Sequence, residues 1–433
     1  MNITDFSLKL NGFPLKETQK KLSEIQKKDF HDYDAYISQS KKNIVTYHLQ
    51  NNSFYKSFCK EGFTTWDNLP ILTKKDLQIP LQNRLSKGFS IKNVYVNKTS
   101  GSTGNPFYFA KDKFCHALTW SIIKNRFNWH ELYGKKQARF YGIPKETIPR
   151  IKERLKDLFS NRYRFDVFNL SDSAFDLWLT KFRKNNFTYI NGYTTVIVAF
   201  ANYLNSKKIV LKDICPSIKA CVVTSEMCFD EDKAIINKAF GVPVINEYGA
   251  SELDLIAFQN TSNQWIINTE SLFVEVVDDN NKSLPYGQLG RLIITSLYNK
   301  AHPFIRYDLG DLGVLKKINS KTILLEKLEG RKEDYIQLPS GKMAPGLAFY
   351  YVTKSVMADN GLVKEIKVLQ TKIDSFEIHY SATNNLSEKQ QQIIQNALYE
   401  YLEPNLNISF HKFEQLERSK SGKLKQFTSL ISL

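Results

Sequence analysis

The middle of the chain alternates between short apolar runs and segments of helical spacing, and this alternation constrains the fold more than any other feature. The strand-like runs ARFYGI, FTYINGY, IKACVVTSE and VPVINEYGASE are separated by expected helices over Phe175 to Asn186 and Val196 to Asn205. A third helix, AIINKAFG, ends at Gly241, which suits a helix C-cap. Strands that alternate with helices predict α/β layers around a mostly parallel sheet.

The two ends of the chain have different textures. The first ninety residues look helical and end in LPILTKKDL, where Thr73 is expected to cap a helix that begins at Lys74. Beyond Trp265, short strands and turns dominate. The tail after about Arg331 contains one clear helix, which begins with a capping box at Ser387.

At 433 residues the chain is longer than one hydrophobic core usually supports, so more than one domain is expected. The change of texture places the division between residues 330 and 331. We therefore expect an α/β fold with a large N-terminal domain of layered β-sheets and helices, residues 1–330. A small, mobile α+β domain is expected to follow over residues 331–433.

Composition limits the function classes. The longest apolar stretch, VIVAFANYL, is far shorter than the ~20 residues of a membrane helix, so no membrane span is expected. The N-terminus has no signal-peptide pattern, which predicts a cytoplasmic protein. The five cysteines form no CxxC pair and have no standard zinc spacing, so they are expected to be buried thiols.

The net charge is +16, from 60 basic and 44 acidic residues. Such an excess suits nucleic acid, an anionic membrane surface or a phosphorylated substrate. The lysines are spread along the whole chain and no recognition motif accompanies them, so no nucleic-acid partner is expected. A basic binding protein without chemistry remains an alternative.

The string TSGSTGNP, from Thr99 to Pro106, combines three kinds of feature that favour anion binding: hydroxyl side chains, glycines and a closing proline. Glycines permit the positive φ angles at which successive amides converge on an anion, and the hydroxyls add donors. The string follows an expected strand over Ile91 to Lys98. It is neither a Walker loop nor a GxGxxG turn, and alone it is as consistent with a surface loop.

Three further motifs follow it. INEYGASEL, at the end of an apolar strand, offers Tyr248 as a stacking face and Glu252 as a hard ligand for Mg²⁺. PFIRYDLGD ends in Asp311, which suits hydrogen bonding to ribose hydroxyls, and SKSGKLKQF presents Lys423 after a glycine. Taken singly, these motifs are equally consistent with a core tyrosine, an ordinary turn and a solvated basic tail.

In this order and spacing, the motifs resemble the adenylate-forming superfamily of acyl-CoA synthetases, peptide-synthetase adenylation domains and luciferases. GRKEDYI, at Gly330 to Ile336, matches the hinge motif of that superfamily. LPILTKKDL, FNLSDSAFDLW and YINGYTTVI make the chain most similar to the phenylacetate–CoA ligase and CapK-like branch, the latter associated with capsular polysaccharide biosynthesis. The resemblance runs from about Asn68 to the C-terminus.

The resemblance implies a role for each matching residue. The ATP phosphates would be held by Thr99, Ser100, Gly101, Ser102, Thr103 and Gly104. The remaining nucleotide contacts would come from Tyr248 and Gly249 at adenine, Ser251 and Glu252 at phosphate and Mg²⁺, Asp311 at ribose, and Arg331 nearby. The hinge pivot would be Asp334, the adenylation lysine Lys423, and the acyl pocket would include Tyr193, Gly249 and Ala250.

The chain departs from the family pattern at three points. Asn105 occupies the place where many relatives have a lysine after the last loop glycine. A second SGK string makes Lys342 a rival for the role of Lys423. The segment LDLIAFQNTSNQWIINTE lacks the Cys and His residues that bind zinc in some relatives, so no zinc is expected.

The activity implied by the resemblance is a ligation in two steps. A small carboxylic acid would be activated by ATP and Mg²⁺ as an acyl-adenylate. The acyl group would then pass to an acceptor, which is either coenzyme A as a co-substrate or an amine or hydroxyl. The oligomeric state is left open, with a homodimer as one alternative.

Overall fold

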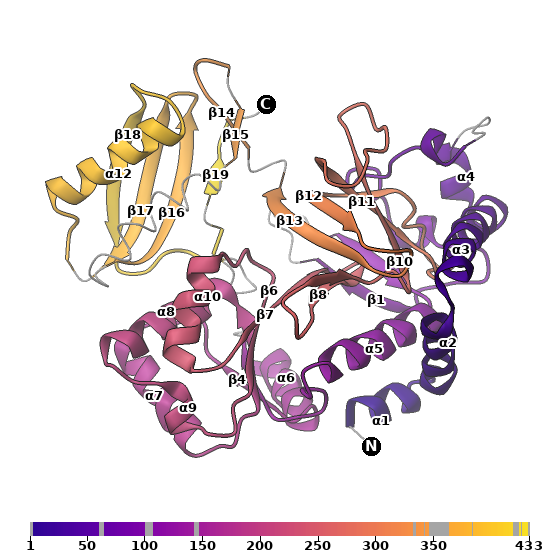
Figure 1. The fold of residues 1–433 in the computed structure, drawn as a ribbon, viewed down its shortest axis with the longest axis horizontal. Helices are drawn as coiled ribbons and strands as arrows, with labels where there is room; N and C mark the ends of the chain where they lie inside the picture. The colour runs from indigo at the N-terminus through magenta and orange to yellow at the C-terminus, as the bar shows by residue number, and fades with distance from the viewer. Residues whose placement is uncertain are drawn as a thin grey trace. The chain divides into compact units, whose positions relative to one another are not determined.

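The computed structural model describes residues 3–59, 65–99, 107–142, 147–331, 335–341, 343–345, 363–382, 384–418, 424–425 and 427–431. The chain divides into two compact units (Figure 1). Unit 1 comprises Met1–Lys135, Leu158–Asn161 and Ile245–Leu328; unit 2 comprises Lys136–Asp157, Arg162–Val244 and Glu329–Leu433. The domain division between residues 330 and 331 stays a prediction.

Unit 1 begins with helices and continues into antiparallel strands. Its helices are α1 (Ile3–Leu10), α2 (Leu15–Lys27), α3 (Phe30–Asn51), α4 (Ser53–Cys59) and α5 (Lys113–Asn128), with short 3-10 turns η1 (Trp66–Asn68) and η2 (Leu81–Arg84). Its strands are β1 (Tyr95–Lys98), β2 (Tyr108–Lys111), β7 (Val244–Ala250), β8 (Asp254–Gln259), β9 (Trp265–Ile267), β10 (Leu272–Val277), β11 (Leu289–Ser296), β12 (Tyr307–Lys317) and β13 (Ile323–Arg331). The strands other than the β1–β2 pair follow the order β10-β11-β12-β13-β9-β8-β7.

Unit 2 contains parallel strands in the order β6-β5-β3-β4 and a smaller mixed sheet in the order β18-β17-β16-β19. The first group consists of β3 (Gln137–Phe140), α6 (Thr147–Phe159), β4 (Arg162–Phe165), α7 (Asp172–Arg183), β5 (Tyr189–Tyr193), α8 (Thr194–Ser206), α9 (Leu211–Ile214), β6 (Ala220–Thr224) and α10 (Asp230–Phe240). The second consists of the pair β14 (Tyr335–Gln337) and β15 (Met343–Pro345), then β16 (Val363–Lys372), β17 (Ser375–Ala382), α12 (Glu388–Tyr401), β18 (Asn407–Phe413) and β19 (Phe427–Ser429).

The α/β fold with a large sheet and a small C-terminal sheet is confirmed, but the expected mostly parallel sheet is found only in unit 2. There β3 pairs in parallel with β4 and β5, and β5 pairs in parallel with β6, because helices connect these strands. In unit 1 the pairs β7–β8, β8–β9, β10–β11 and β11–β12 are antiparallel. No helix connects the two strands of any of these pairs, so the chain folds back into an antiparallel neighbour rather than crossing over to a parallel one.

The local predictions for helices are mostly confirmed. Gly241 adopts a left-handed φ of 68° directly after α10, and Ser387 forms the expected capping box with Gln390 at the start of α12. The helix expected from Lys74 is wrong: the segment is only a turn. The Asp76 carboxylate accepts hydrogen bonds from both the amide and the hydroxyl of Thr73, and this local closure satisfies the groups that a longer helix would use.

Each unit has its own apolar interior. In unit 2, Phe140, Ile190 and Val223 of the parallel strands pack against Trp178 of α7 and Phe200 of α8. A separate cluster joins the small sheet to α12. In unit 1, residues of α3 and α4 pack with the buried face of the antiparallel strands.

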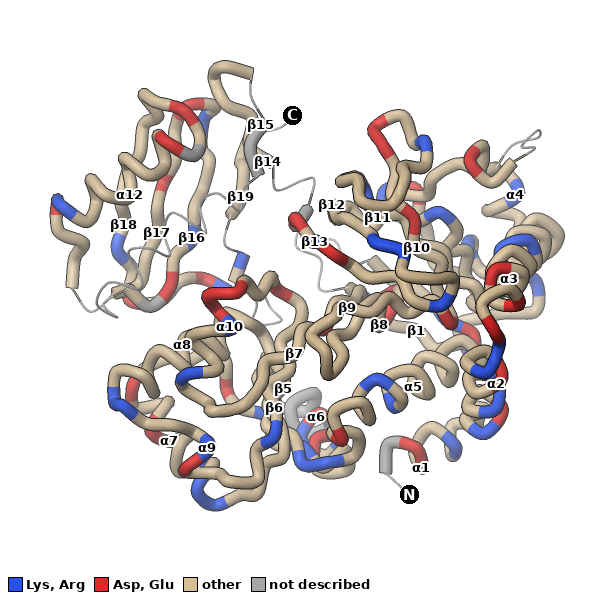
Figure 2. Tube along the Cα trace, in the orientation of Figure 1, with Lys and Arg blue, Asp and Glu red and all other residues tan. Residues whose placement is uncertain are grey.

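The other composition-based expectations concern the cysteines, membrane helices and the distribution of charge. The five cysteines are free thiols, four of them buried and Cys228 half-buried, as expected. No helix within the described ranges is long and apolar enough to cross a membrane. Lysine and arginine are distributed over both units rather than gathered in one segment (Figure 2).

His48 of α3 is fully buried in unit 1 as a neutral imidazole. Its Nε2 donates to the backbone oxygen of Asn299 at 2.9 Å, and its Nδ1 accepts from the Ser86 hydroxyl at 3.2 Å. Burial lowers the pKa of His48 to about 4, although its bond to Asn299 opposes the shift. The unfolded chain therefore takes up a proton at this site before the folded chain does.

We expect stability to fall as the pH falls from about 6.5 towards 4, with this group contributing a loss of about 3 kcal/mol at full protonation. Urea unfolding at several pH values measures the slope. His48→Gln keeps a donor for Asn299 and should flatten the slope in this window, whereas His31→Gln, at an exposed position, should leave it unchanged. An equal slope in wild type and His48→Gln would contradict the assignment.

Candidate functional site

The glycine-rich segment is bounded by the β1–β2 hairpin of unit 1. Lys98 pairs with Tyr108, and just beyond them the Thr99 amide donates to the oxygen of Phe107 at 2.9 Å. The strands thus hold both ends of the segment in register. The predicted phosphate-binding residues within it lie outside the described residues: Ser100, Gly101, Ser102, Thr103 and Gly104.

The YGASE motif forms the turn between β7 and β8. Gly249 pairs with Leu255, and a Cβ at this glycine would lie 2.4 Å from the backbone oxygen of Asp254, so no larger residue fits. Tyr248 and Glu252 are buried, with 8% and 6% of their surface exposed, whereas Ser251 is exposed. The turn therefore fixes one aromatic ring and one carboxylate inside unit 1.

Two hydrogen bonds join this turn to the RYDLGD motif on β12. The Tyr248 hydroxyl donates to Oδ2 of Asp311 at 2.6 Å, and the Tyr307 hydroxyl donates to Oε1 of Glu252 at 3.0 Å. Each bond pairs a phenol with a carboxylate, which strengthens it relative to a bond between neutral groups. The structure thereby brings together the residues predicted at adenine, ribose and Mg²⁺.

A buried lysine that sequence reasoning missed connects the hairpin to the same turn. Lys111, the last residue of β2, has 2% of its side chain exposed. Its Nζ forms an ion pair with the Asp254 carboxylate and lies 3.2 Å from the backbone oxygen of Ser251. Asp254 itself adopts a left-handed φ of 60°. A single lysine in a strand gives no local signal, because its partner is 143 residues away.

Arg306, the first residue of the RYDLGD motif, is a second buried cation that the sequence analysis did not identify. Its side chain is fully buried, with Nε 3.1 Å from Oε1 of Glu275 and Nη1 donating to the oxygens of Asp67 and Leu69 at 2.8 and 2.9 Å. Its backbone oxygen accepts from the Leu72 amide at 3.1 Å. LPILTKKDL, noted in the sequence only as a branch-specific motif, is thus a neighbour of β12.

A second buried arginine lies beside the start of β2. Arg84 donates to the oxygen of Tyr108 at 2.8 Å, to the oxygen of Ile79 at 3.0 Å and to Nε2 of His302 at 2.8 Å. Burial lowers the pKa of Arg84 to about 10, so the guanidinium keeps its charge at neutral pH. Burial also lowers the pKa of His302, which keeps that ring neutral as an acceptor.

The other predicted site residues belong to different units or lie outside the described residues. Tyr193, almost fully buried, ends β5 of unit 2, whereas Ala250, half-buried, ends β7 and belongs to unit 1. Arg331 is the last residue of β13. Asp334, Lys342 and Lys423 lie outside the described residues. The acyl pocket, the hinge and the adenylation lysine therefore stay predictions.

No group of three His, Cys, Asp or Glu residues in the described part of the chain is placed to hold a metal ion. The expected absence of zinc stays a prediction. Glu252 is thus the single carboxylate that the motif analysis offers for Mg²⁺.

Solved structures share the fold. A 2-hydroxyisobutyryl-CoA ligase in the postadenylation state, in complex with 2-HIB-AMP, aligns with a TM-score of 0.71 at 15% identity, covering 92% of this chain and 89% of that one. The amide bond synthetase McbA from Marinactinospora thermotolerans aligns with a TM-score of 0.53 at 12% identity, covering 76% of this chain and 68% of that one.

No family model matches the sequence. In sequence, 419 residues of the chain are 24% identical to Protein CapK of Staphylococcus aureus, covering 93% of this chain and 88% of that protein. Over 193 residues, the chain is also 25% identical to the phenylacetate-coenzyme A ligase of Pseudomonas putida, covering 42% of this chain and 43% of that protein.

Fold, motifs and sequence relatives agree in their resemblance to the adenylate-forming superfamily. Within that superfamily, the chain is similar in sequence to CapK over nearly its whole length and to phenylacetate-coenzyme A ligase over part of it.

We expect Lys111→Met to lower the free energy of unfolding by about 3 kcal/mol, because it leaves the Asp254 carboxylate without its buried partner. The double variant Lys111→Met with Asp254→Asn should recover much of this loss, since asparagine is neutral and tolerates the left-handed φ. Lys113→Met, at an exposed position two residues away, serves as the control in urea unfolding. Equal stability of Lys111→Met and Lys113→Met would rule out the buried pair as a stabilising contact.

Proposed function

We propose that this protein uses ATP to activate a carboxylic acid as an acyl-adenylate, releasing pyrophosphate, and then transfers the acyl group to an acceptor. The observation that carries the proposal is the pair of bonds joining Tyr248 to Asp311 and Tyr307 to Glu252. These bonds bring together within unit 1 an aromatic ring and two carboxylates, the residues to which the resemblance gives roles at adenine, ribose and Mg²⁺. The use of ATP fits the cytoplasmic location expected from the sequence.

Each nucleotide-side residue has a distinct physical task. Tyr248 offers its ring face to adenine, and its hydroxyl fixes the rotamer of Asp311, whose carboxylate accepts hydrogen bonds from ribose hydroxyls. The segment from Thr99 to Gly104 would surround the phosphates with amides and hydroxyls. The charge of Arg84, which donates to the backbone oxygen of Tyr108 at the start of β2, favours an anion near that segment. This charge offsets part of the positive charge that is missing at Asn105, where many relatives have a lysine.

The donor chemistry of Glu252 fits a magnesium ion. Its carboxylate is a hard oxygen ligand, and the Tyr307 hydroxyl holds one oxygen in place. When bound, Mg²⁺ supplies charge neutralisation at the phosphates, which lowers the barrier for attack on the α-phosphorus. Lys423 is proposed as the mobile cation that holds the carboxylate and the α-phosphate together while negative charge develops between them. Its place on the small C-terminal part would allow withdrawal after adenylation.

Two acceptor classes remain within the proposal. Solved neighbours include ligases for coenzyme A, which supports thioester formation. The similarity to CapK over nearly the whole chain, and to a structure named an amide bond synthetase, supports an amine or hydroxyl acceptor. For the second class, surface-polysaccharide assembly is the proposed setting.

Acid-dependent exchange of labelled pyrophosphate into ATP tests the first half-reaction. A panel of carboxylic acids should yield at least one acid that supports exchange by the wild type, and a non-catalytic binding protein would support none. Lys423→Ala should lower that exchange by about a hundredfold or more while ATP still binds, and Lys342→Ala should leave it close to wild type. Near-normal exchange by Lys423→Ala would overturn the role given to this lysine, and a large loss in Lys342→Ala would transfer it.

Tyr248→Phe tests the nucleotide side. Loss of the hydroxyl frees the Asp311 carboxylate to rotate, so the KM for ATP in the exchange assay should rise about tenfold with a smaller change in kcat. Tyr286→Phe removes a hydroxyl from an exposed position of unit 1 and is the matched control. An unchanged KM for ATP in Tyr248→Phe would argue against Asp311 as a ribose ligand.

A further inference from the structure

Unit 2 presents a row of polar side chains on one face of its parallel strands. Ala138 and Phe140 of β3 face the apolar core, so Gln137 and Arg139, which alternate with them, lie on the opposite face. In register with Arg139 are Arg164 on β4 and Asn191 on β5. The face therefore has several arginines within one or two strand spacings.

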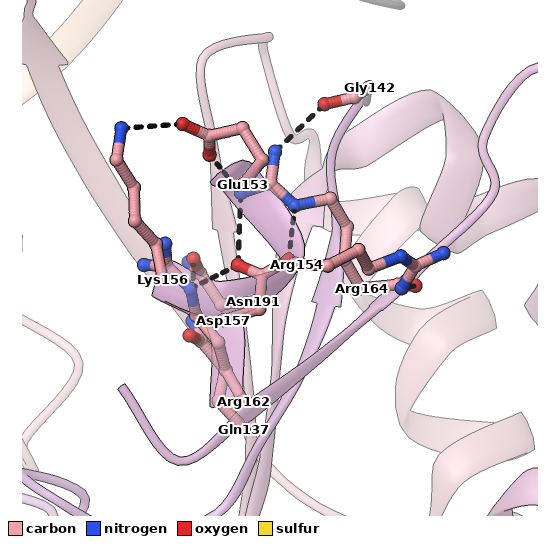
Figure 3. A network of polar contacts seen from close by, with 9 residues as sticks. All are labelled: Gln137, Gly142, Glu153, Arg154, Lys156, Asp157, Arg162, Arg164 and Asn191. Carbon is pink, nitrogen blue, oxygen red and sulfur yellow. Dashed lines mark hydrogen bonds and ion pairs between the residues drawn. The ribbon is translucent and has the colours of Figure 1, made fainter. Parts of the chain in front are cut away.

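Two carboxylates of α6 neutralise part of this charge (Figure 3). Asp157 accepts from Arg162 Nε at 2.5 Å and from Arg164 Nε and Nη2 at 2.9 and 3.0 Å. Glu153 lies 3.0 Å from Arg164 and 2.6 Å from Lys156. These two carboxylates thus form ion pairs with three basic side chains, and both already have partners other than Arg139.

Within the part of the chain that the structure describes, Arg139 has no such partner. Its Nε is buried without a hydrogen-bond acceptor, and no carboxylate among the described residues forms an ion pair with its guanidinium. The guanidinium instead lies over the ring of Tyr141, 4.0 Å from the centroid. Burial, and secondarily the charge of Arg139, lowers the pKa of Arg162. A half-buried cation left uncompensated is unfavourable unless an anion binds it.

The position of Arg139 connects it to the predicted acyl pocket. It lies one residue before the carboxyl end of β3, and parallel strands bind ligands at that edge. The ring of Tyr141 contacts the ring of Tyr193, the predicted acyl-pocket residue at the end of β5, with centroids 4.7 Å apart. One aromatic pair therefore separates the cation from the residue expected beside the acyl group.

We propose that the acid activated by this enzyme carries a second anionic group, a carboxylate or a phosphate, which Arg139 binds. The inference rests on the proposed function, because it specifies the acid that the adenylating site takes. The planar guanidinium can hold either group through two parallel hydrogen bonds, and Tyr141 would keep it oriented.

The test compares acids that differ only in the distal group. Pyrophosphate exchange is measured with hexanoate and adipate, and with butyrate, succinate and 3-phosphonopropionate, so that the carboxylate and phosphonate arms are separate. Wild type should prefer the dianionic member of at least one pair. Arg139→Gln should lower the ratio of kcat/KM for the dianion to that for its monoanionic partner about ten- to hundredfold.

Two further variants separate charge from folding. Arg139→Lys keeps the charge without the two-point contact and should give an intermediate ratio, whereas Lys184→Gln removes an exposed positive charge of unit 2 and should leave the ratio unchanged. Calorimetric titration of adipate into the protein without ATP gives a readout that needs no turnover. Adipate should bind to wild type and more weakly to Arg139→Gln.

The outcomes separate this inference from the proposed function. If acids support exchange but the ratio is the same in wild type and Arg139→Gln, the inference is overturned and the adenylating function stands. If no acid supports exchange while adipate binds in an Arg139-dependent way, the function fails and the anion site stands. If Arg139→Gln slows only transfer to the acceptor, the anion belongs to the acceptor and the inference is wrong.

Discussion

The bonds from Tyr248 to Asp311 and from Tyr307 to Glu252 cross between the same two elements, the β7–β8 turn and β12. A crossed pair fixes both the spacing and the relative rotation of these elements, which one bond does not. Both carboxylates lie in buried surroundings, where a loose acid would be unfavourable, so the tyrosines stabilise the groups that the proposed chemistry needs. Other buried polar contacts stabilise the surrounding parts of unit 1.

Three buried cations of unit 1 form these contacts, and each has a different set of hydrogen-bond acceptors. Lys111 pairs with a carboxylate across the YGASE turn, Arg306 combines one carboxylate with several backbone oxygens, and Arg84 donates to neutral acceptors. Such contacts make the surrounding loops rigid, because each loop oxygen has one donor at a set distance. Arg139 of unit 2 differs, since its buried Nε has no acceptor among the described residues. The contrast separates cations that build the fold from one that is available to a ligand.

The elements of unit 2 were largely predictable because their signals are local. Helical spacing, the left-handed glycine after α10 and the capping box of α12 each depend on residues within one or two turns. The antiparallel arrangement of unit 1 was not predictable from the same patterns, because a buried strand has the same apolar run in either direction. The expected helix from Lys74 was wrong because Thr73 bonds to Asp76 instead. This contact spans as few residues as a helix cap does, so the sequence pattern does not distinguish the two.

By itself, the sequence determined the α/β character and predicted the chemistry of the four motifs and the class of reaction, because residue type and order along the chain carry that information. Only the tertiary structure decided which motifs meet. It joined YGASE to RYDLGD, brought LPILTKKDL against β12 and gave Lys111 its partner 143 residues away. The physical reason is that these contacts link strands far apart in the chain, where no periodicity records the register. Among the described residues it also left the buried Nε of Arg139 without an acceptor, a property that only the placement of the neighbouring side chains decides.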